Sequence, residues 1–222
     1  MIILKIGGSI LTEKDLAEPK VDYENLNRIA DEIRESLYAE EISNDLIDGL
    51  VIVHGAGSFG HPPAKKYQIG QPFEMKDYLE KKIGFAEVQN EVKKLNSIIC
   101  ESLIEHGIPV IAIPPSSFIT SHNKRIYDFD LNLIKTYLRE GFVPVLFGDV
   151  VIDDEVNSIE DIKFLESTTN VDVTGGMVGK VKELLDLADY GISSEIINAN
   201  EEGAIAKALQ GMKVNGTKIC RK

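Results

Sequence analysis

The stretch that decides the fold is Val51-Ile-Val-His-Gly-Ala-Gly-Ser-Phe-Gly-His61. The apolar run from Leu50 to Val53 is typical of a short buried strand. It is followed at once by three glycines within six residues, which fill no core and cost backbone entropy. Glycines are useful where backbone N–H groups must approach an anion closely. We therefore predict a strand that ends in a loop able to hold a phosphate. The plain alternative is a tight turn with a surface His61.

The loop is close to a P-loop without being one. Its spacing is Gly55-x-x-x-x-Gly60, but His61 stands where a P-loop has lysine and Pro62 where it has serine or threonine. The physical expectation is similar, because a strand leads into backbone amides and then into a side chain that can bond to an anion. We expect residues 62–80, with three prolines and a glycine, to be irregular.

Strand and helix patterns alternate on both sides of this loop. Further strands are predicted at 2–6, 109–113 and 142–147, with helices over 22–37, 81–106 and 130–141. Residues 150–153 resemble one arm of a hairpin. After residue 170 the patterns predict a helix from about 176, a strand at 195–198, a helix at 203–209 and a strand at 217–220. This order predicts an α/β fold with an open, mainly parallel sheet sandwiched by helices, which binds ligands at its carboxyl edge.

Two other segments place lysines beside glycines. Lys5 lies in the first strand directly before Gly7-Gly8-Ser9, and Lys14 follows in the next loop. Thr174-Gly-Gly leads into a helix that carries Lys180. Lys5 and Lys180 are placed to contact a phosphate near a strand end or a helix N-terminus, although each is equally compatible with an ordinary solvated side chain. Lys14, in a loop, is on its own more typical of a solvated side chain.

Composition excludes several classes of function. The 222 residues carry a net charge of −12, which argues against a nucleic-acid or anionic-membrane surface. No apolar run is long enough to span a membrane, and the first residues read as a strand with no signal peptide. Two distant cysteines, Cys100 and Cys220, favour a reducing, cytoplasmic compartment.

Four segments together resemble the amino acid kinase superfamily, and within it the archaeal isopentenyl phosphate kinase family. They are Lys5-x-Gly-Gly-Ser9, His54-Gly-Ala-Gly-Ser-Phe-Gly-His61, Gly148-Asp149 after a strand, and Asp172-Val-Thr-Gly-Gly-Met-x-x-Lys180. The resemblance covers residues 1–153 and roughly 170–222. It implies an ATP- and Mg²⁺-dependent kinase that converts isopentenyl phosphate into isopentenyl diphosphate in isoprenoid synthesis, as a homodimer with no nucleic-acid or membrane partner.

The resemblance also implies roles for individual residues. The family's catalytic residues correspond to His61, Lys5 and Lys14. The family's acceptor-binding residues correspond to Gly55, Ala56, Ser58, Gly60, His61 and Gly148. The family's nucleotide-binding residues correspond to Lys5, Gly7, Gly8, Ser9, Gly57, Gly176 and Lys180. We add Ile83 and Phe85 as an apolar wall for a five-carbon tail, although core packing is their simpler role. No residues are assigned to a metal, since Mg²⁺ would be held by nucleotide oxygens.

The chemistry fits this assignment without a catalytic base. Transfer between two phosphates starts from an acceptor that is already an anion, so it needs charge neutralisation and in-line positioning rather than proton removal. A histidine on the acceptor and lysines over the transferring group supply these. A kinase that acts on a hydroxyl would usually place a carboxylate there.

The chain departs from the family pattern in one region. Family members carry about forty to fifty further residues after the position of residues 154–157, including a Ser-Gly-Asp turn and a Thr-Asp-Val-Asp-Gly loop that this sequence lacks. We therefore predict an acceptor lobe at 1–153 and an incomplete nucleotide lobe at 154–222. Three explanations are open, namely residues missing from the printed sequence, an engineered deletion and natural loss. The alternatives to the main function are a kinase for another phosphate or phosphonate such as fosfomycin, and a non-catalytic phosphate-binding remnant.

Overall fold

The computed structural model describes residues 1–13, 18–39, 49–71, 73–122, 125–153 and 176–221. The chain forms two compact units, Met1–Glu166 and Ser167–Lys222. The first contains the glycine loop at 55–60 and most of the helices. The division into an acceptor lobe at 1–153 and a nucleotide lobe at 154–222 stays a prediction.

A parallel sheet forms the centre of the first unit. Its strands run in the order β1-β2-β6-β3. Their bounds are Ile2–Ile6 for β1, Leu50–His54 for β2, Val143–Phe147 for β6 and Val110–Ala112 for β3. Ile6 pairs with His54 and His54 with Phe147, so three strands end at the same level. The segments that follow these three strands therefore meet at one edge of the sheet.

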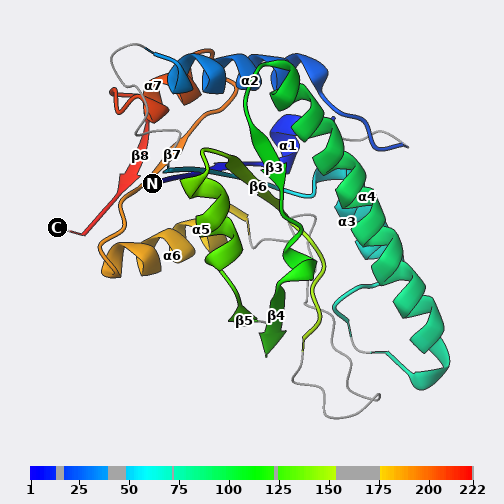
Figure 1. The fold of residues 1–222 in the computed structure, drawn as a ribbon. Coiled ribbons are helices and arrows are strands. Elements are labelled where there is room, and N and C mark those ends of the chain that lie inside the picture. Colours follow the sequence, from blue (N-terminus) through cyan, green and yellow to red (C-terminus); the bar gives the residue numbers. More distant parts are fainter. Residues whose placement is uncertain (14–17, 40–48, 72, 123–124, 154–175, 222) are drawn as a thin grey trace. The chain divides into compact units, whose positions relative to one another are not determined.

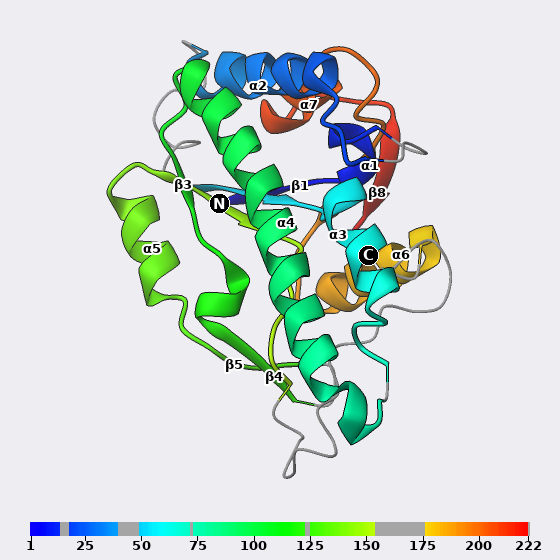
Figure 2. The ribbon, with the colours of Figure 1, turned by 90° about the vertical axis from the view of Figure 1, so that its right-hand side faces the viewer.

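Helices cover both faces of this sheet, as predicted. Figures 1 and 2 show α2 (Tyr23–Leu37) above the sheet and α5 (Asn132–Arg139) below it. Side chains alternate along β2, so Val51 packs with Ile134 and Leu138 of α5 while Leu50 and Ile52 are completely buried. This division into two apolar faces is why the strand reads as a continuous apolar run.

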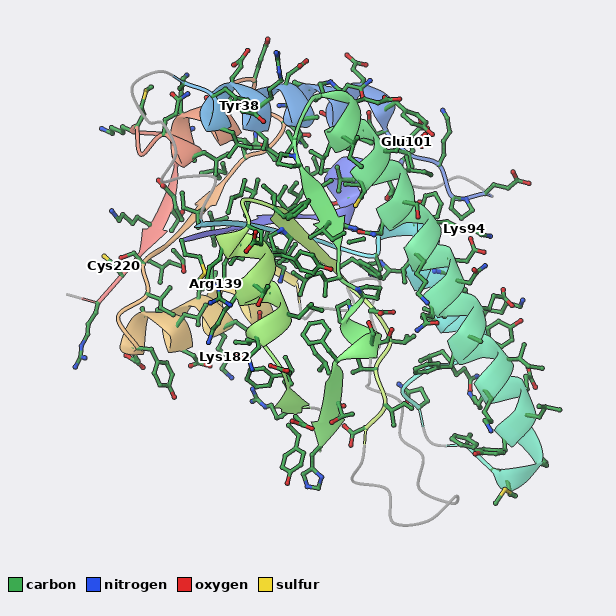
Figure 3. All side chains as sticks on the ribbon, viewed as in Figure 1. Tyr38, Lys94, Glu101, Arg139, Lys182 and Cys220 are labelled. Carbon is green, nitrogen blue, oxygen red and sulfur yellow. The ribbon has the colours of Figure 1, made fainter. Side chains whose placement is uncertain are left out.

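Two helices show how local sequence fixes their ends and faces. Asp22 caps α2, accepting a hydrogen bond of 3.0 Å from the Asn25 N–H. The long helix α4 (Tyr78–Glu105) contacts β3, β6, α2 and α3. Its outer side is polar, and Figure 3 shows Lys94 and Glu101 projecting away from the sheet. The helix predicted over 81–106 is therefore found, and it buries one side against these elements.

The segment after the glycine loop differs from the prediction of an irregular chain. Helix α3 runs from Gly57 to Lys66 and includes Pro62 and Pro63, and a short 3-10 helix, η2, follows at Met75–Asp77. Because proline has no N–H group, Pro62 cannot donate a helical hydrogen bond to the Ser58 carbonyl, and Pro63 cannot donate one to the Phe59 carbonyl. The helix continues because α3 packs along α4, and this tertiary contact offsets the two missing bonds.

The segment between β3 and α5 also contains elements that were not predicted. It contains the 3-10 helix η3 (Pro115–Ser117) and an antiparallel hairpin of β4 (Ile119–His122) and β5 (Arg125–Phe129), neither of which the sequence patterns predicted. The expectation that 150–153 forms a hairpin arm is wrong. Asp153 makes an isolated parallel bridge to Ser121, whose N–H donates to the Ile152 carbonyl at 3.0 Å.

The second unit contains α6 (Gly176–Asp189), β7 (Ser194–Ile197), α7 (Ala204–Leu209) and β8 (Gly216–Ile219). β7 and β8 pair antiparallel, with Ser194 opposite Ile219. The predicted elements are all found here, displaced by one residue at most. Across the described parts of both units, no helix is long and apolar enough to cross a membrane.

Candidate active site

Two glycine loops touch each other backbone to backbone at the carboxyl edge of the sheet. Gly7 precedes α1 (Gly8–Leu11), and Ala56 precedes α3. The Gly55 N–H donates to the Ile6 carbonyl at 3.1 Å. A Cβ atom on Gly8 would lie 2.5 Å from the Gly57 nitrogen, and one on Gly55 would lie 2.7 Å from the Gly8 nitrogen. The glycines are therefore required by the close approach of the two loops.

Thr12 joins these two loops. Its side chain is buried, and Oγ1 donates to the Gly8 carbonyl at 2.9 Å while accepting from the Ser58 N–H at 3.1 Å. Gly57 has a φ of 53°, and a Cβ atom there would lie 2.6 Å from the same Oγ1. Sequence reasoning missed Thr12, because a threonine in a loop gives no signal of the residue 46 positions away that it contacts.

The N-terminus of α3 presents donors that no part of the described chain uses. No side chain caps the helix, and the N–H groups of Ala56, Gly57 and Phe59 have no hydrogen-bond partner among the described residues. The Ser58 hydroxyl is buried and likewise has no partner there. Buried or crowded polar groups are normally satisfied, so this set of donors indicates a site for an anion.

Gly148 lies opposite this N-terminus. Its N–H donates to the His54 carbonyl at 2.9 Å, and a Cβ atom on it would lie 3.2 Å from the Ala56 nitrogen. Gly148 is exposed, and its missing side chain leaves space beside the Ala56 nitrogen. The structure thus brings together the predicted acceptor residues Gly55, Ala56, Ser58 and Gly148.

The wall beside Gly148 is fixed by hydrogen bonds. The Asp149 carboxylate accepts from the Ser116 N–H at 3.0 Å and from the Val150 N–H at 2.9 Å. Gln89 of α4 donates to the Ser116 hydroxyl at 2.7 Å. These bonds connect the end of β6, η3 and α4, so Asp149 has a positioning role.

The two histidines at the ends of the loop occupy different surroundings. His61 is half-buried in the second turn of α3, at the helix that carries the free donors. His54 is 1% exposed and stacks on Phe147 with ring centroids 5.6 Å apart. Burial lowers the pKa of His54 below its ordinary value, so the ring is neutral.

The predicted lysines are placed less completely. Lys5 lies exposed in β1, in register with Val53, two residues before Gly7. Gly7, Gly8 and Ser9 form the turn into α1. Lys14 lies outside the described residues. The roles of Lys5 and Lys14 on the transferring phosphate therefore stay predictions.

The predicted apolar wall is divided. Phe85 is half-buried and packs against the cluster of Ile69 and Val88, whereas Ile83, on the same helix, is 54% exposed. The described structure therefore does not bring these two side chains into one wall. In the second unit, Gly176 begins α6 and Lys180 follows four residues later, half-buried.

The described residues do not hold a protein-built metal site. No group of three or more His, Cys, Asp or Glu side chains in that part of the chain is arranged around a metal ion. The site offers donors for an anion instead. A metal bound through the oxygens of a phosphate ligand is compatible with such a site.

Comparison with known proteins matches the amino acid kinase family over residues 1–159. The chain belongs to this family and has its fold, with a central parallel sheet flanked by helices. Among its members, the chain is similar to isopentenyl phosphate kinases. It is 42% identical to the isopentenyl phosphate kinase of Methanothermobacter thermautotrophicus, with 100% of both chains covered. It is 33% identical to that of Methanocaldococcus jannaschii, with 99% of this chain and 98% of the relative covered.

Solved structures agree. An X-ray structure of isopentenyl phosphate kinase matches with a TM-score of 0.84 and 41% identity, covering 98% of this chain and 99% of the other. The alignment with the Methanothermobacter protein spans 274 positions, so at least 52 of them have no counterpart among the 222 residues of this chain. This difference is consistent with the prediction that the chain lacks a segment present in other family members.

Proposed function

We propose that the protein transfers the terminal phosphoryl group of ATP to isopentenyl phosphate, giving isopentenyl diphosphate and ADP. The observation that carries this proposal is the set of unpartnered donors at the N-terminus of α3, formed by the Ala56, Gly57 and Phe59 N–H groups and the Ser58 hydroxyl. Full-length similarity to proteins named isopentenyl phosphate kinase supports the choice of acceptor.

The acceptor phosphate binds at these donors in the proposed mechanism. The positive end of α3 and its N–H groups stabilise the dianion. Gly148, which lacks a side chain, leaves room beside the Ala56 N–H. His61, one turn along α3, donates a hydrogen bond to the acceptor phosphate. An oxygen of that phosphate attacks the terminal phosphorus of ATP, the bond to the bridging oxygen breaks, and ADP leaves with the electron pair.

The nucleotide phosphates lie along the other glycine loop in this proposal. Gly7, Gly8 and Ser9 precede or begin α1, whose N-terminus also has no capping side chain. Lys5 and Lys14 neutralise charge on the transferring group, and Gly57, Gly176 and Lys180 contact the nucleotide. Mg²⁺, held by nucleotide oxygens, supplies further charge neutralisation when it is bound. The contact of Gly8 with Gly57 explains how two anions can be held close together.

The tail, the assembly and the compartment are parts of the same proposal. Phe85 and the apolar cluster around Ile69 and Val88 contribute one side of a pocket for the isoprenoid tail. We propose a homodimer, as the family resemblance implies. A reducing, cytoplasmic compartment is supported by the free thiols of Cys100 and Cys220.

Turnover of isopentenyl phosphate tests the proposal directly. Formation of isopentenyl diphosphate and ADP is measured with ATP and Mg²⁺, for the wild type and for His61→Ala. A loss of one positioned hydrogen bond to a charged group is expected to lower kcat/KM by about 10- to 100-fold. Unchanged turnover in the variant would remove His61 from the mechanism. Competition with fosfomycin distinguishes the related kinase that takes a phosphonate.

The positions missing relative to the Methanothermobacter protein favour a second candidate. If at least 52 aligned positions are naturally absent, the protein could keep the acceptor site as a non-catalytic phosphate-binding protein. Isothermal titration with a non-hydrolysable ATP analogue separates the two, because tight nucleotide binding is incompatible with such a remnant. An intact mass well above 24.6 kDa would show that the molecule contains residues beyond this sequence.

A further inference from the structure

The buried His54 ring contacts the peptide group that precedes the anion site. Its Nδ1 lies 3.0 Å from the Gly55 carbonyl oxygen, and its Nε2 lies 3.1 Å from Oδ1 of Asn96. Asn96 is a buried residue of α4, 42 positions away. The ring is therefore held from α4 and in turn contacts the loop.

The protonation of the ring follows from these partners. A carbonyl oxygen can only accept, so Nδ1 must carry the proton and donate to Gly55. A neutral imidazole then has a lone pair on Nε2, which requires a donor. Rotation of the Asn96 side chain by 180° exchanges its oxygen and its NH₂ at the same place, and the NH₂ satisfies Nε2.

The bond to the Gly55 oxygen also sets the direction of the next N–H. The peptide between Gly55 and Ala56 is planar and trans, so its C=O and N–H point in opposite directions. With the oxygen drawn toward the buried ring, the Ala56 N–H points away from the ring. A Cβ atom on Gly148 would lie 3.2 Å from the Ala56 nitrogen, so the glycine leaves space beside this donor. This N–H has no partner among the described residues.

We infer that His54 is a positioning residue that holds the Gly55–Ala56 peptide with its N–H directed at the acceptor phosphate. The ring touches neither substrate and acts through this peptide. The inference rests on the proposed acceptor site and adds the residue that orients one of its donors. It also explains why a histidine occupies the end of a strand that is otherwise apolar.

Kinetics of His54→Phe test the inference. Phenylalanine keeps an aromatic ring against Phe147 and removes the bond to Gly55. The KM for isopentenyl phosphate is expected to rise about tenfold, as for loss of a hydrogen bond to a charged group, while the KM for ATP changes less than about twofold.

Ser102→Ala is the matched control, because Ser102 is a buried α4 residue whose hydroxyl donates to Asn27 rather than to the loop. It should lower stability without raising the acceptor KM. An unchanged acceptor KM in the His54→Phe variant would overturn the inference.

Two measurements on the full chain do not depend on turnover. In the wild type, ¹⁵N shifts of the His54 ring should show a protonated Nδ1 and an unprotonated Nε2, and the reverse tautomer overturns the inference whether or not any variant folds. In protein labelled with [¹⁵N]alanine, titration with inorganic phosphate should shift the Ala56 amide in the wild type and in Ser102→Ala, and much less in His54→Phe. An equal shift in His54→Phe refutes the role of His54. If phosphate shifts Ala56 but isopentenyl phosphate is not turned over, the proposed reaction fails while the positioning role stands.

Discussion

The two ends of helix α3 are built in opposite ways. The N-terminal end, at Gly57, has no capping side chain, and N–H groups there have no partner among the described residues. The C-terminal end is closed by a Schellman motif, in which the Gln68 N–H donates to Lys65 at 3.1 Å and the Ile69 N–H to Ala64 at 2.9 Å. One end keeps donors that the described residues do not use, and the other end is satisfied within the protein.

Side chains of α4 complete the closed end. The buried Lys81 ammonium donates to the Tyr67 carbonyl at 2.6 Å and to the Gln68 carbonyl at 3.3 Å. The Tyr67 ring packs on Gly84, where a Cβ atom would lie 2.3 Å from the ring. The Tyr67 hydroxyl donates to Glu87 at 2.6 Å and is the main reason why the pKa of that carboxyl lies below its ordinary value.

The comparison shows how a helix can keep unsatisfied donors at a fixed place. Free N–H groups cost stability and would favour a local rearrangement that satisfies them. The C-terminal bonds to α4 and the Thr12 bond to Ser58 prevent this, because they fix the helix without using the Ala56, Gly57 and Phe59 donors. Substitutions at the two ends should therefore differ in whether they change activity or only stability.

The largest effect is expected at the open end from Gly57→Ala. The residue has a φ of 53°, and its new methyl would lie 2.6 Å from Thr12 Oγ1. Strain in the left-handed region and overpacking together should lower the free energy of unfolding by about 3 kcal/mol and abolish most activity. Denaturant unfolding and turnover measure both.

Gly107→Ala is the matched control for this substitution. Gly107 has a φ of 79°, but nothing lies within 4 Å of its Cβ position. The free energy of unfolding of the Gly107→Ala variant should therefore fall by only about 1–2 kcal/mol because of backbone strain, and the variant should keep its activity. Equal losses for the two variants would show that the contact between Gly57 and Thr12 is unimportant.

Lys81→Met tests the closed end. It leaves the Tyr67 and Gln68 carbonyls without the Lys81 donor, so the free energy of unfolding should fall by about 2–3 kcal/mol. The kcat of the folded fraction should change only a few-fold, since no proposed substrate contact is removed. Lys82→Met, next to it but exposed, is the control and should be nearly neutral. A variant as stable as the wild type would contradict the role given to Lys81.

Thr12→Val tests the link between the loops. Valine keeps the shape of threonine but loses the bonds to Gly8 and Ser58, so stability should fall by about 1–2 kcal/mol. We also expect kcat/KM to fall about tenfold, because the two glycine loops are no longer held together. Thr12→Ser keeps the hydroxyl and should recover most of the activity. Failure of serine to do better than valine would show that packing, and not the hydroxyl, matters.

The smallest effect is a gain in stability from Gln68→Gly. Gln68 has a φ of 48° and is the one residue other than glycine with a positive φ in the described chain. Glycine relieves this strain, so the free energy of unfolding should rise by about 0.5–1 kcal/mol with unchanged turnover. The comparison variant Lys65→Gly, inside the same helix, should lower the free energy of unfolding by about 1 kcal/mol. A destabilised Gln68→Gly variant would show that the glutamine side chain contributes more than its backbone strain costs.

Much of the fold followed from local patterns. The apolar strands, the capping Asp22 and the paired glycines after two strands are signals that lie within a few residues of one another. The hairpin at 119–129 and the continuation of α3 through two prolines were missed, because edge strands with exposed side chains have weak patterns and because a helix can be held by its neighbour.

The sequence by itself determined the family, the strands of the central sheet with the helices that alternate with them, and the glycine loop as the expected place of an anion, since these depend on residue types at short spacing. Only the tertiary structure decided that His54 is buried against Asn96, that Thr12 joins two loops and that Lys81 closes a helix. Each of these contacts joins residues from different elements, 42, 46 and 14 positions apart. Such pairs leave no periodic trace in the sequence, because they depend on how the elements pack and not on how each one forms.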